Sequence, residues 1–181
     1  MYWTDEEYLL SKNIFNENSL LIEVFTLNHG KYTGVVYGGT SRKRKTGFQI
    51  GNKILLNWTS KNKNRSGYFS SELIKPISPF FFEDKKKTIC ILSATSILRI
   101  LLPERQTNEV IYNSLEKMFN DLKLNDWIHL YIMWEILLIK ELGFETDLSL
   151  YENNSININN KSFKIPKILQ NNTSATKDPF N

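Results

Sequence analysis

The chain has 181 residues, of which 41% are hydrophobic and 13% aromatic, so it can bury a core and is not disordered along most of its length. Its net charge of +4 is unevenly distributed. Residues 1–75 contain 11 Lys and Arg against 6 Asp and Glu, whereas residues 76–150 contain 8 against 11. The segment 31–75 holds ten basic residues and a single acid, Glu72, which predicts a positive face on the first part of the chain.

The single cysteine, Cys90, excludes a disulfide framework and a cysteine-based zinc site. The N-terminus carries acids where a signal peptide needs basic residues. The longest apolar stretch, residues 127–139, is interrupted by His129 and Glu135 and is too short to cross ~30 Å of hydrocarbon. These features predict a soluble, cytoplasmic protein with no membrane partner, no metal and no cofactor.

The first 75 residues contain five short segments rich in aliphatic and aromatic residues and separated by turn residues, which is the pattern of β-strands. Gly34 in the third segment predicts a bulge or a sharp bend. Together they predict a small closed barrel of the OB type, spanning residues 1–78. The expected strands are Glu7–Ser11, Leu20–Thr26, Lys31–Tyr37, Ile54–Thr59 and Tyr68–Ile74.

The segment 75–79 contains two prolines, which cannot continue a central strand, and we interpret it as a linker. Beyond it the apolar residues recur at helical spacing, which predicts helices over 84–102, 107–122 and 126–142 in a helical domain of residues 79–150. The fold class is therefore α+β. The face expected to be buried on the first helix carries Ile89, Leu92, Ser96, Ile97, Ile100 and Leu101.

Residues 151–181 include eight Asn and only a weak alternation of apolar residues. They predict a hairpin followed by a tail that is partly disordered or truncated.

The clearest candidate site is the run Arg42, Lys43, Arg44 and Lys45, which follows the pair Gly38-Gly39. Cations in a flexible loop suit the phosphates of a nucleic acid, because neutralising each phosphate releases condensed counterions. A solvated loop with no partner is the alternative. The glycine pair is not a nucleotide-binding loop, because no Gly-Lys-Ser/Thr follows it. The run is reinforced by Lys31, Lys53, Lys61, Lys63 and Arg65.

Five aromatic residues flank these cations, and strand alternation directs about half of them into the barrel. Of the group, Tyr37 is the residue we expect to stack on bases of a single strand. The five are Tyr32, Tyr37, Phe48, Trp58 and Tyr68.

Catalytic residues are not indicated. His29 and His129 lie far apart and neither has a neighbour that completes a metal pair or a triad. Cys90 on an apolar helix face is typical of packing. The acids Asp5, Glu6 and Glu7 are interpreted as a solvated element start. The sequence predicts that the protein is not an enzyme.

The order of these features resembles the RecO proteins, particularly those of alphaproteobacteria. The resemblance rests on Trp3-Thr4-Asp5-Glu6, Leu27–Tyr32, the Gly38–Arg42 segment, Leu101–Arg105, Tyr131–Glu135 and Glu141–Phe144, in that order across residues 1–150.

The resemblance implies an N-terminal OB-fold DNA-binding domain, a helical domain and a role in recombinational DNA repair by the RecFOR pathway. Such proteins bind single- and double-stranded DNA, anneal complementary strands and, with RecR, help load RecA onto strands covered by single-stranded DNA-binding protein. The resemblance places DNA-binding cations at Arg42–Lys45 and implies a location at the nucleoid. Many relatives hold zinc with four cysteines after the Glu-Leu-Gly-Phe segment, and this chain has none there. Relatives also continue with further helices, so we expect the chain to lack the C-terminal end.

Two other classes remain open: an RNA-binding OB-fold protein, since that barrel serves both nucleic acids, and a non-catalytic adaptor whose basic patch meets an acidic protein.

Overall fold

The computed structural model describes residues 2–41, 44, 47–60, 67–144, 146–147, 155–158 and 161–164. It has the predicted α+β organisation, with a closed barrel followed by helices. Two compact units, Met1–Tyr112 and Asn113–Asn181, make up the chain and are described separately.

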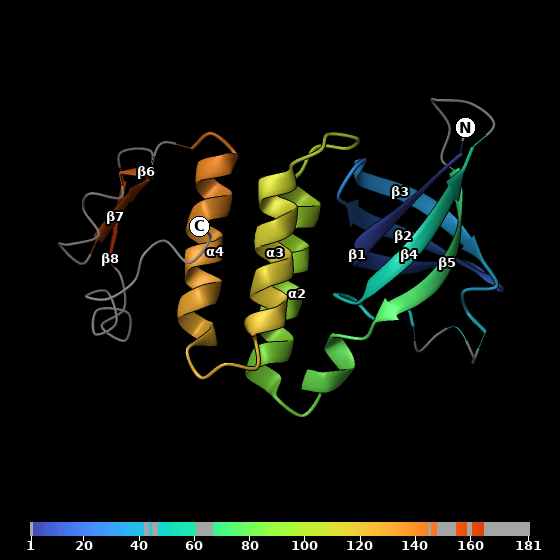
Figure 1. Cartoon of the computed structure of the whole chain (residues 1–181), viewed down its shortest axis with the longest axis horizontal. Helices are drawn as coiled ribbons and strands as arrows, with labels where there is room; N and C mark the ends of the chain where they lie inside the picture. Colours follow the sequence, from blue (N-terminus) through green and yellow to red (C-terminus); the bar gives the residue numbers. More distant parts are fainter. Residues whose placement is uncertain are drawn as a thin grey trace. The chain divides into compact units, whose positions relative to one another are not determined.

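Five strands form the closed barrel in the order β1-β2-β3-β5-β4, and β4 pairs back with β1 (Figure 1). Within the barrel, β3 and β5 pair in parallel and the other neighbouring strands pair antiparallel. This confirms the predicted OB-type barrel and the number of its strands. The strands are β1 (Tyr2–Asn16), β2 (Ser19–Thr26), β3 (Gly30–Tyr37), β4 (Lys53–Thr59) and β5 (Gly67–Lys75).

Strand β1 is longer than predicted and contains a bulge that the sequence analysis did not find. Its pairing with β2 steps from Leu9 opposite Val24 to Ser11 opposite Glu23, so Leu10 is the extra residue. The bulge shifts the alternation by one position. As a result Lys12 stands opposite the core residue Ile22, and the inward positions along β1 change from odd-numbered, as at Leu9, to even-numbered.

The bulge predicted at Gly34 is wrong, because the β2–β3 register runs without a shift from Ser19 opposite Tyr37 to Thr26 opposite Gly30. The alternative prediction, a sharp bend, stays a prediction. Glycine is needed there for a different reason. A Cβ at Gly34 would lie 2.4 Å from the ring of Phe69. Gly34 therefore allows the close approach of β3 and β5 that closes the barrel.

Alternate residues of the strands fill the barrel, as period-2 patterning requires. Trp3 and Tyr32 are partly buried and pack against this core. The buried core consists of Leu9, Leu20, Ile22, Val24, Val36, Phe48, Ile54, Leu56, Trp58 and Phe69.

The segment predicted to be a linker is held against the barrel. It leads into the short helix η1 (Ser78–Phe81), and both Ile77 and Ser78 are buried. The side-chain oxygen of fully buried Asn52 accepts hydrogen bonds from the backbone N–H groups of Ile77, at 2.8 Å, and Ser78, at 3.2 Å. The exit from the barrel is thus fixed rather than free. The expected domain boundary between residues 78 and 79 stays a prediction.

Helix α2 (Lys85–Leu101) begins where the Asp84 carboxylate accepts the backbone N–H groups of Lys86 and Lys87, an N-cap that satisfies two free donors. The face predicted to be buried on this helix is wrong: Ile89 and Ile100 are 61% and 78% exposed. The helix carries apolar residues on two sides, and periodicity alone does not choose between them. The buried side consists of Cys90, Ile91, Ala94, Thr95 and Leu98.

Helix α3 (Glu109–Asp121) begins at Asn108, whose side chain accepts the backbone N–H of Ile111 at 2.9 Å, as expected for an N-cap. Helix α4 (Trp127–Glu141) ends before Gly143, which has a left-handed φ of 82°. Within α4 only Trp134, Ile136 and Leu138 are buried, although most of the helix is apolar.

A small sheet follows α4, with strand order β6-β7-β8. Its last two strands pair antiparallel, with Ile156 opposite Phe163, which agrees with the predicted hairpin. The strands are β6 (Thr146–Asp147), β7 (Ser155–Ile158) and β8 (Lys161–Lys164).

Candidate nucleic-acid interface

Three of the residues predicted to contact DNA are described by the structure: Lys31, Tyr37 and Arg44. The others lie outside the described residues, and their assignment stays a prediction. They are Arg42, Lys43, Lys45, Lys61, Lys63 and Arg65.

The outer surface of the β3–β5 junction carries a pair of exposed tyrosines. Tyr37, the last residue of β3, is 61% exposed, and Tyr68, the second residue of β5, is 43% exposed. Their ring centroids lie 6.0 Å apart with the planes at 58°. They face outward because the neighbouring residues, Val36 and Phe69, point into the core.

A cation adjoins this tyrosine pair. Exposed Arg44 donates a hydrogen bond from Nη1 to the backbone oxygen of Tyr37 at 3.1 Å. That contact uses one of the five N–H donors of a guanidinium. Two exposed aromatic rings and a guanidinium group therefore lie side by side on this part of the barrel.

Along the chain, each of the two predicted basic segments lies near one tyrosine of the Tyr37–Tyr68 pair. The run from Arg42 to Lys45 begins five residues after Tyr37, beyond the Gly38-Gly39 turn. The segment from Lys61 to Arg65 precedes Tyr68 with only Ser66 and Gly67 between them. Each tyrosine is thus close along the chain to a basic loop.

Lys31 has a structural contact of its own. It is 9% exposed, and its Nζ donates to the backbone oxygen of Arg99 at 2.7 Å. Lys53 is also 9% exposed and forms an ion pair with Glu6 at 2.8 Å. Lys31 therefore joins the barrel to α2, and the ion pair of Lys53 joins β4 to β1 within the barrel.

The expected division of the aromatic residues agrees with the structure. Phe48 and Trp58 are buried and belong to the core, and Tyr32 packs against it. Tyr68 was not singled out by the sequence. The signal available was its position one residue out of phase with an inward-facing strand residue, Phe69.

The acids of β1 do not form a solvated element start, as the sequence analysis had interpreted them. Asp5 is buried and accepts hydrogen bonds from the backbone and side-chain nitrogens of Asn28, at 2.8 and 3.0 Å. It also contacts His29 Nδ1 at 3.0 Å. The Asn28–His29 turn, part of the segment that carried the family resemblance, is therefore anchored to β1.

Glu7 is fully buried, and neither of its carboxyl oxygens has a hydrogen-bond partner in the described part of the chain. Burial, and secondarily the nearby charge of Asp5, raise the pKa of the Glu7 carboxyl well above its usual value. Across residues 2–144 apart from the two undescribed loops, no group of three or more His, Cys, Asp or Glu side chains is arranged to hold a metal ion.

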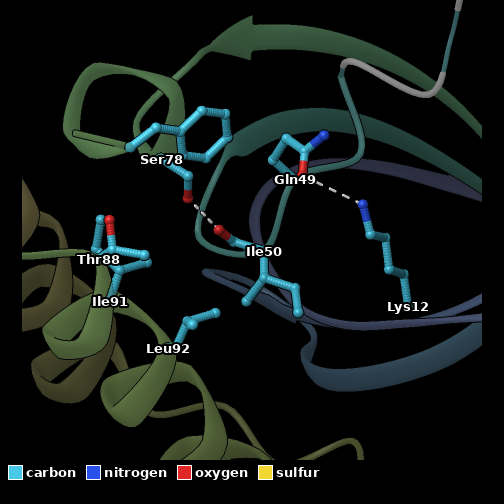
Figure 2. A pocket seen from close by; sticks show the side chains of 8 residues that line it. Lys12, Gln49, Ile50, Ser78, Thr88, Ile91 and Leu92 are labelled. Carbon is cyan, nitrogen blue, oxygen red and sulfur yellow. Dashed lines mark hydrogen bonds between the residues drawn. The ribbon is translucent and has the colours of Figure 1, made fainter. Parts of the chain in front are cut away.

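Two cavities lie next to the barrel within the first unit. One, which we call the joint cavity, has a volume of about 170 Å³ and lies between the barrel, η1 and α2. Figure 2 shows Lys12 directed toward Gln49, to which its Nζ donates at 3.3 Å, and Ser78 directed toward the backbone oxygen of Ile50, to which its hydroxyl donates. The Ser78–Ile50 bond joins η1 to the segment before β4, whereas the Lys12–Gln49 bond joins β1 to that same segment.

The second, which we call the barrel-end cavity, has a volume of about 240 Å³. Its lining comes from β1, β2, the turn after β3 and the segment before β4. The residues are Lys12, Asn13, Ile14, Leu20, Gly39, Thr40 and Phe48.

No helix in the described residues is both long enough and apolar enough to cross a membrane.

A closed barrel with this strand order, an exposed aromatic pair and adjoining basic segments defines an OB-fold protein followed by helices. The family model described as "Recombination protein O N terminal" matches residues 1–77, and "Recombination protein O C terminal" matches residues 83–150. The chain therefore belongs to the RecO family.

Curated relatives agree with this assignment. The chain is 34% identical over 169 residues to the DNA repair protein RecO of Ehrlichia chaffeensis, an alignment that covers 92% of this chain and 68% of the relative. It is 34% identical over 151 residues to the protein of the same name from Wolbachia sp. subsp. Drosophila simulans, covering 82% and 62%. The RecO of Rhodospirillum centenum is 29% identical over 147 residues, covering 81% and 59%. The chain thus spans about three fifths to two thirds of the length of these relatives.

Proposed function

We propose that this chain is a non-catalytic DNA-binding mediator of recombinational repair, which binds single- and double-stranded DNA and anneals complementary strands. The observation that carries the proposal is the exposed pair Tyr37 and Tyr68 beside Arg44, at the strand ends next to the two basic segments. Membership of the RecO family supports the role in repair.

The geometry suits a single strand in two ways. The guanidinium of Arg44 and the cations of residues 42–45 and 61–65 bind phosphates irrespective of base identity. The rings of Tyr37 and Tyr68 stack on bases, an interaction worth about 1–3 kcal/mol per base. Stacking occupies the faces of the bases and leaves their pairing edges open, so a complementary strand can anneal to the bound one.

The partners follow from the family. We propose that the protein works with RecR to help load RecA onto strands covered by single-stranded DNA-binding protein, in the cytoplasm at the nucleoid. We also propose that residues 1–78 form the DNA-binding domain and residues 79–150 a helical domain. Dispersed amide signals from a fragment of residues 1–78 would support this division, and an unfolded fragment would contradict it.

The central experiment measures affinity for single- and double-stranded DNA across a range of salt concentrations. Replacing Arg42, Lys43, Arg44 and Lys45 together by alanine should flatten the slope of log affinity against log salt by about 3 for a single strand, since each contact contributes roughly 0.7. Replacing Tyr37 and Tyr68 by alanine should weaken single-strand binding by about tenfold or more without changing the slope, because stacking releases no counterions.

The matched control replaces Lys85 and Lys86, two exposed cations at the start of α2, by alanine. It should leave the affinity for DNA and its salt slope unchanged. An unchanged salt slope in the folded quadruple variant would mean that the loop is only solvated. Competition by RNA as strong as that by DNA would instead favour the RNA-binding alternative, and no salt-dependent binding at all would favour the adaptor.

A further inference from the structure

The barrel-end cavity exists because β1 and β2 extend beyond the rest of the barrel. Strand β4 pairs with β1 only as far as Tyr8, whereas β2 pairs with β1 as far as Asn16. The bulge at Leu10 then places Ile14 opposite Leu20, a residue of the barrel core. The inner surface of the barrel is therefore continued outward and left uncovered.

The walls of this cavity are apolar at the base and solvent-accessible at the mouth. Leu20 and Phe48 are 7% and 4% exposed, so the floor is the barrel core itself. Ile14, on the outer wall, is 79% exposed. An apolar floor with a polar rim is the usual construction of a ligand site.

The opposite wall is held in place. A Cβ at Gly39 would lie 3.0 Å from the side chain of Leu20, so glycine allows the turn after β3 to lie close against β2. The Thr40 hydroxyl donates to the backbone oxygen of Glu17 at 2.9 Å, which ties this turn to the β1–β2 hairpin. Since both walls are fixed, little ordering is needed when a ligand enters.

The size and charge of the cavity select the occupant. At about 240 Å³ it is smaller than the roughly 300–1,000 Å³ of sites for drug-sized ligands, so it accommodates one ring system and not a whole nucleotide. The Lys12 ammonium contributes positive charge to the lining, and the run Arg42–Lys45 begins two residues after Thr40. A carboxylate or a free phosphate placed on the apolar floor would lose its hydration, which disfavours such ligands.

We propose that the barrel-end cavity binds one unstacked nucleobase of a single DNA strand, whose phosphates remain outside in solvent. A neutral planar base covers the apolar floor, and its backbone charge stays in solvent near cations. This site rests on the proposed DNA-binding function and adds to it a second place, besides the tyrosine pair, where bases are bound.

The test compares a thymidine strand of roughly 12 nucleotides, within the range that one OB-fold binds, with a strand of equal length that lacks all its bases. Both strands carry the same phosphates. The dissociation constant of the abasic strand divided by that of the thymidine strand therefore measures the contribution of the bases. Replacing Ile14 by serine should lower this ratio about fivefold and leave the affinity for the abasic strand unchanged. The control is Phe15→Ser, which removes a neighbouring exposed apolar side chain, 58% exposed, that does not line the cavity.

A second variant, Thr40→Phe, fills the cavity from the opposite wall and should lower the ratio in the same way. If Ile14→Ser does not fold, Thr40→Phe tests the cavity proposal alone. Wild-type ratios in both folded variants would overturn the cavity proposal while DNA binding itself stands. Binding of neither strand by the wild-type protein would contradict the proposed function, and the cavity proposal with it.

Discussion

Two sides of the barrel use the same kinds of residue for different purposes. On the β3–β5 side, Tyr37 and Tyr68 are exposed beside Arg44. On the side covered by α2 and the start of α3, Tyr8 is buried against Tyr112, with ring centroids 5.4 Å apart. Lys53 lies over both of those rings at 5.8 and 5.9 Å. A tyrosine pair beside a cation can therefore belong to an exposed binding surface or to a buried contact between elements. Whether a helix covers the pair distinguishes the two cases.

The covered side should be important for stability. Tyr112 is 2% exposed, packs against Tyr8 and Phe25, and donates its hydroxyl to the backbone oxygen of Glu6 at 3.2 Å. Replacing it by alanine leaves a large cavity and should lower the free energy of unfolding by about 3–5 kcal/mol. Replacing exposed Tyr37 by alanine should change it by no more than about 0.5 kcal/mol. Chemical denaturation of both variants checks this contrast, and equal losses would show that the two sides do not differ as described.

Glu7, in the interior of the barrel, should make the free energy of unfolding depend on pH, an effect of intermediate size. Below about pH 4.3, the usual pKa of a Glu carboxyl, Glu7 is protonated in both the folded and the unfolded chain. Above that pH the unfolded chain releases the proton, while the folded chain keeps it because burial raises the pKa of Glu7. The free energy of unfolding should therefore fall by about 1.4 kcal/mol per pH unit from this group until the pH reaches the raised folded pKa.

Glu7→Gln removes the titrating group and keeps its shape, so its unfolding free energy should lack this decline. Denaturation of both proteins at several pH values between 4 and 8 gives the difference directly. Parallel pH profiles for the wild-type protein and the variant would mean that Glu7 is ionised in the folded barrel.

Much of the fold was predictable from local pattern, because alternation and turn residues act within a few positions of the chain. The five strands and the three helices followed from it, as did the expectation that about half of the five flanking aromatic residues point into the barrel. The bulge at Leu10 did not, since it depends on how β1 pairs with β2 rather than on any residue within β1. For the same reason Gly34 was assigned a bulge, although the contact that requires glycine comes from Phe69 on another strand.

The candidate site was predictable only in part. A run of cations is visible in any sequence, but whether a given lysine faces solvent depends on an element that is distant along the chain. Lys31 is covered through Arg99, which lies 68 residues away, and Tyr37 gains its neighbour Tyr68 from β5, the strand that pairs with β3 but follows it only after β4 in the chain. Helix α2 has two apolar sides, so its buried side was likewise decided by the barrel against which it packs.

The smallest expected effect is the change in the salt dependence of DNA affinity when a single cation is replaced, either Arg44 on the exposed side or Lys31 on the covered side. Replacing Arg44 by glutamine removes one exposed phosphate contact and should reduce the slope of log affinity against log salt by about 0.7 for a single strand. Lys31 was predicted from the sequence to contact DNA as well, but its ammonium donates to the Arg99 backbone oxygen and its side chain is buried. Lys31→Gln should therefore leave the salt slope unchanged and lower the free energy of unfolding, because the buried Arg99 contact is weakened. A slope reduced equally by both substitutions would place Lys31 on the DNA-binding surface and extend that surface to the covered side of the barrel.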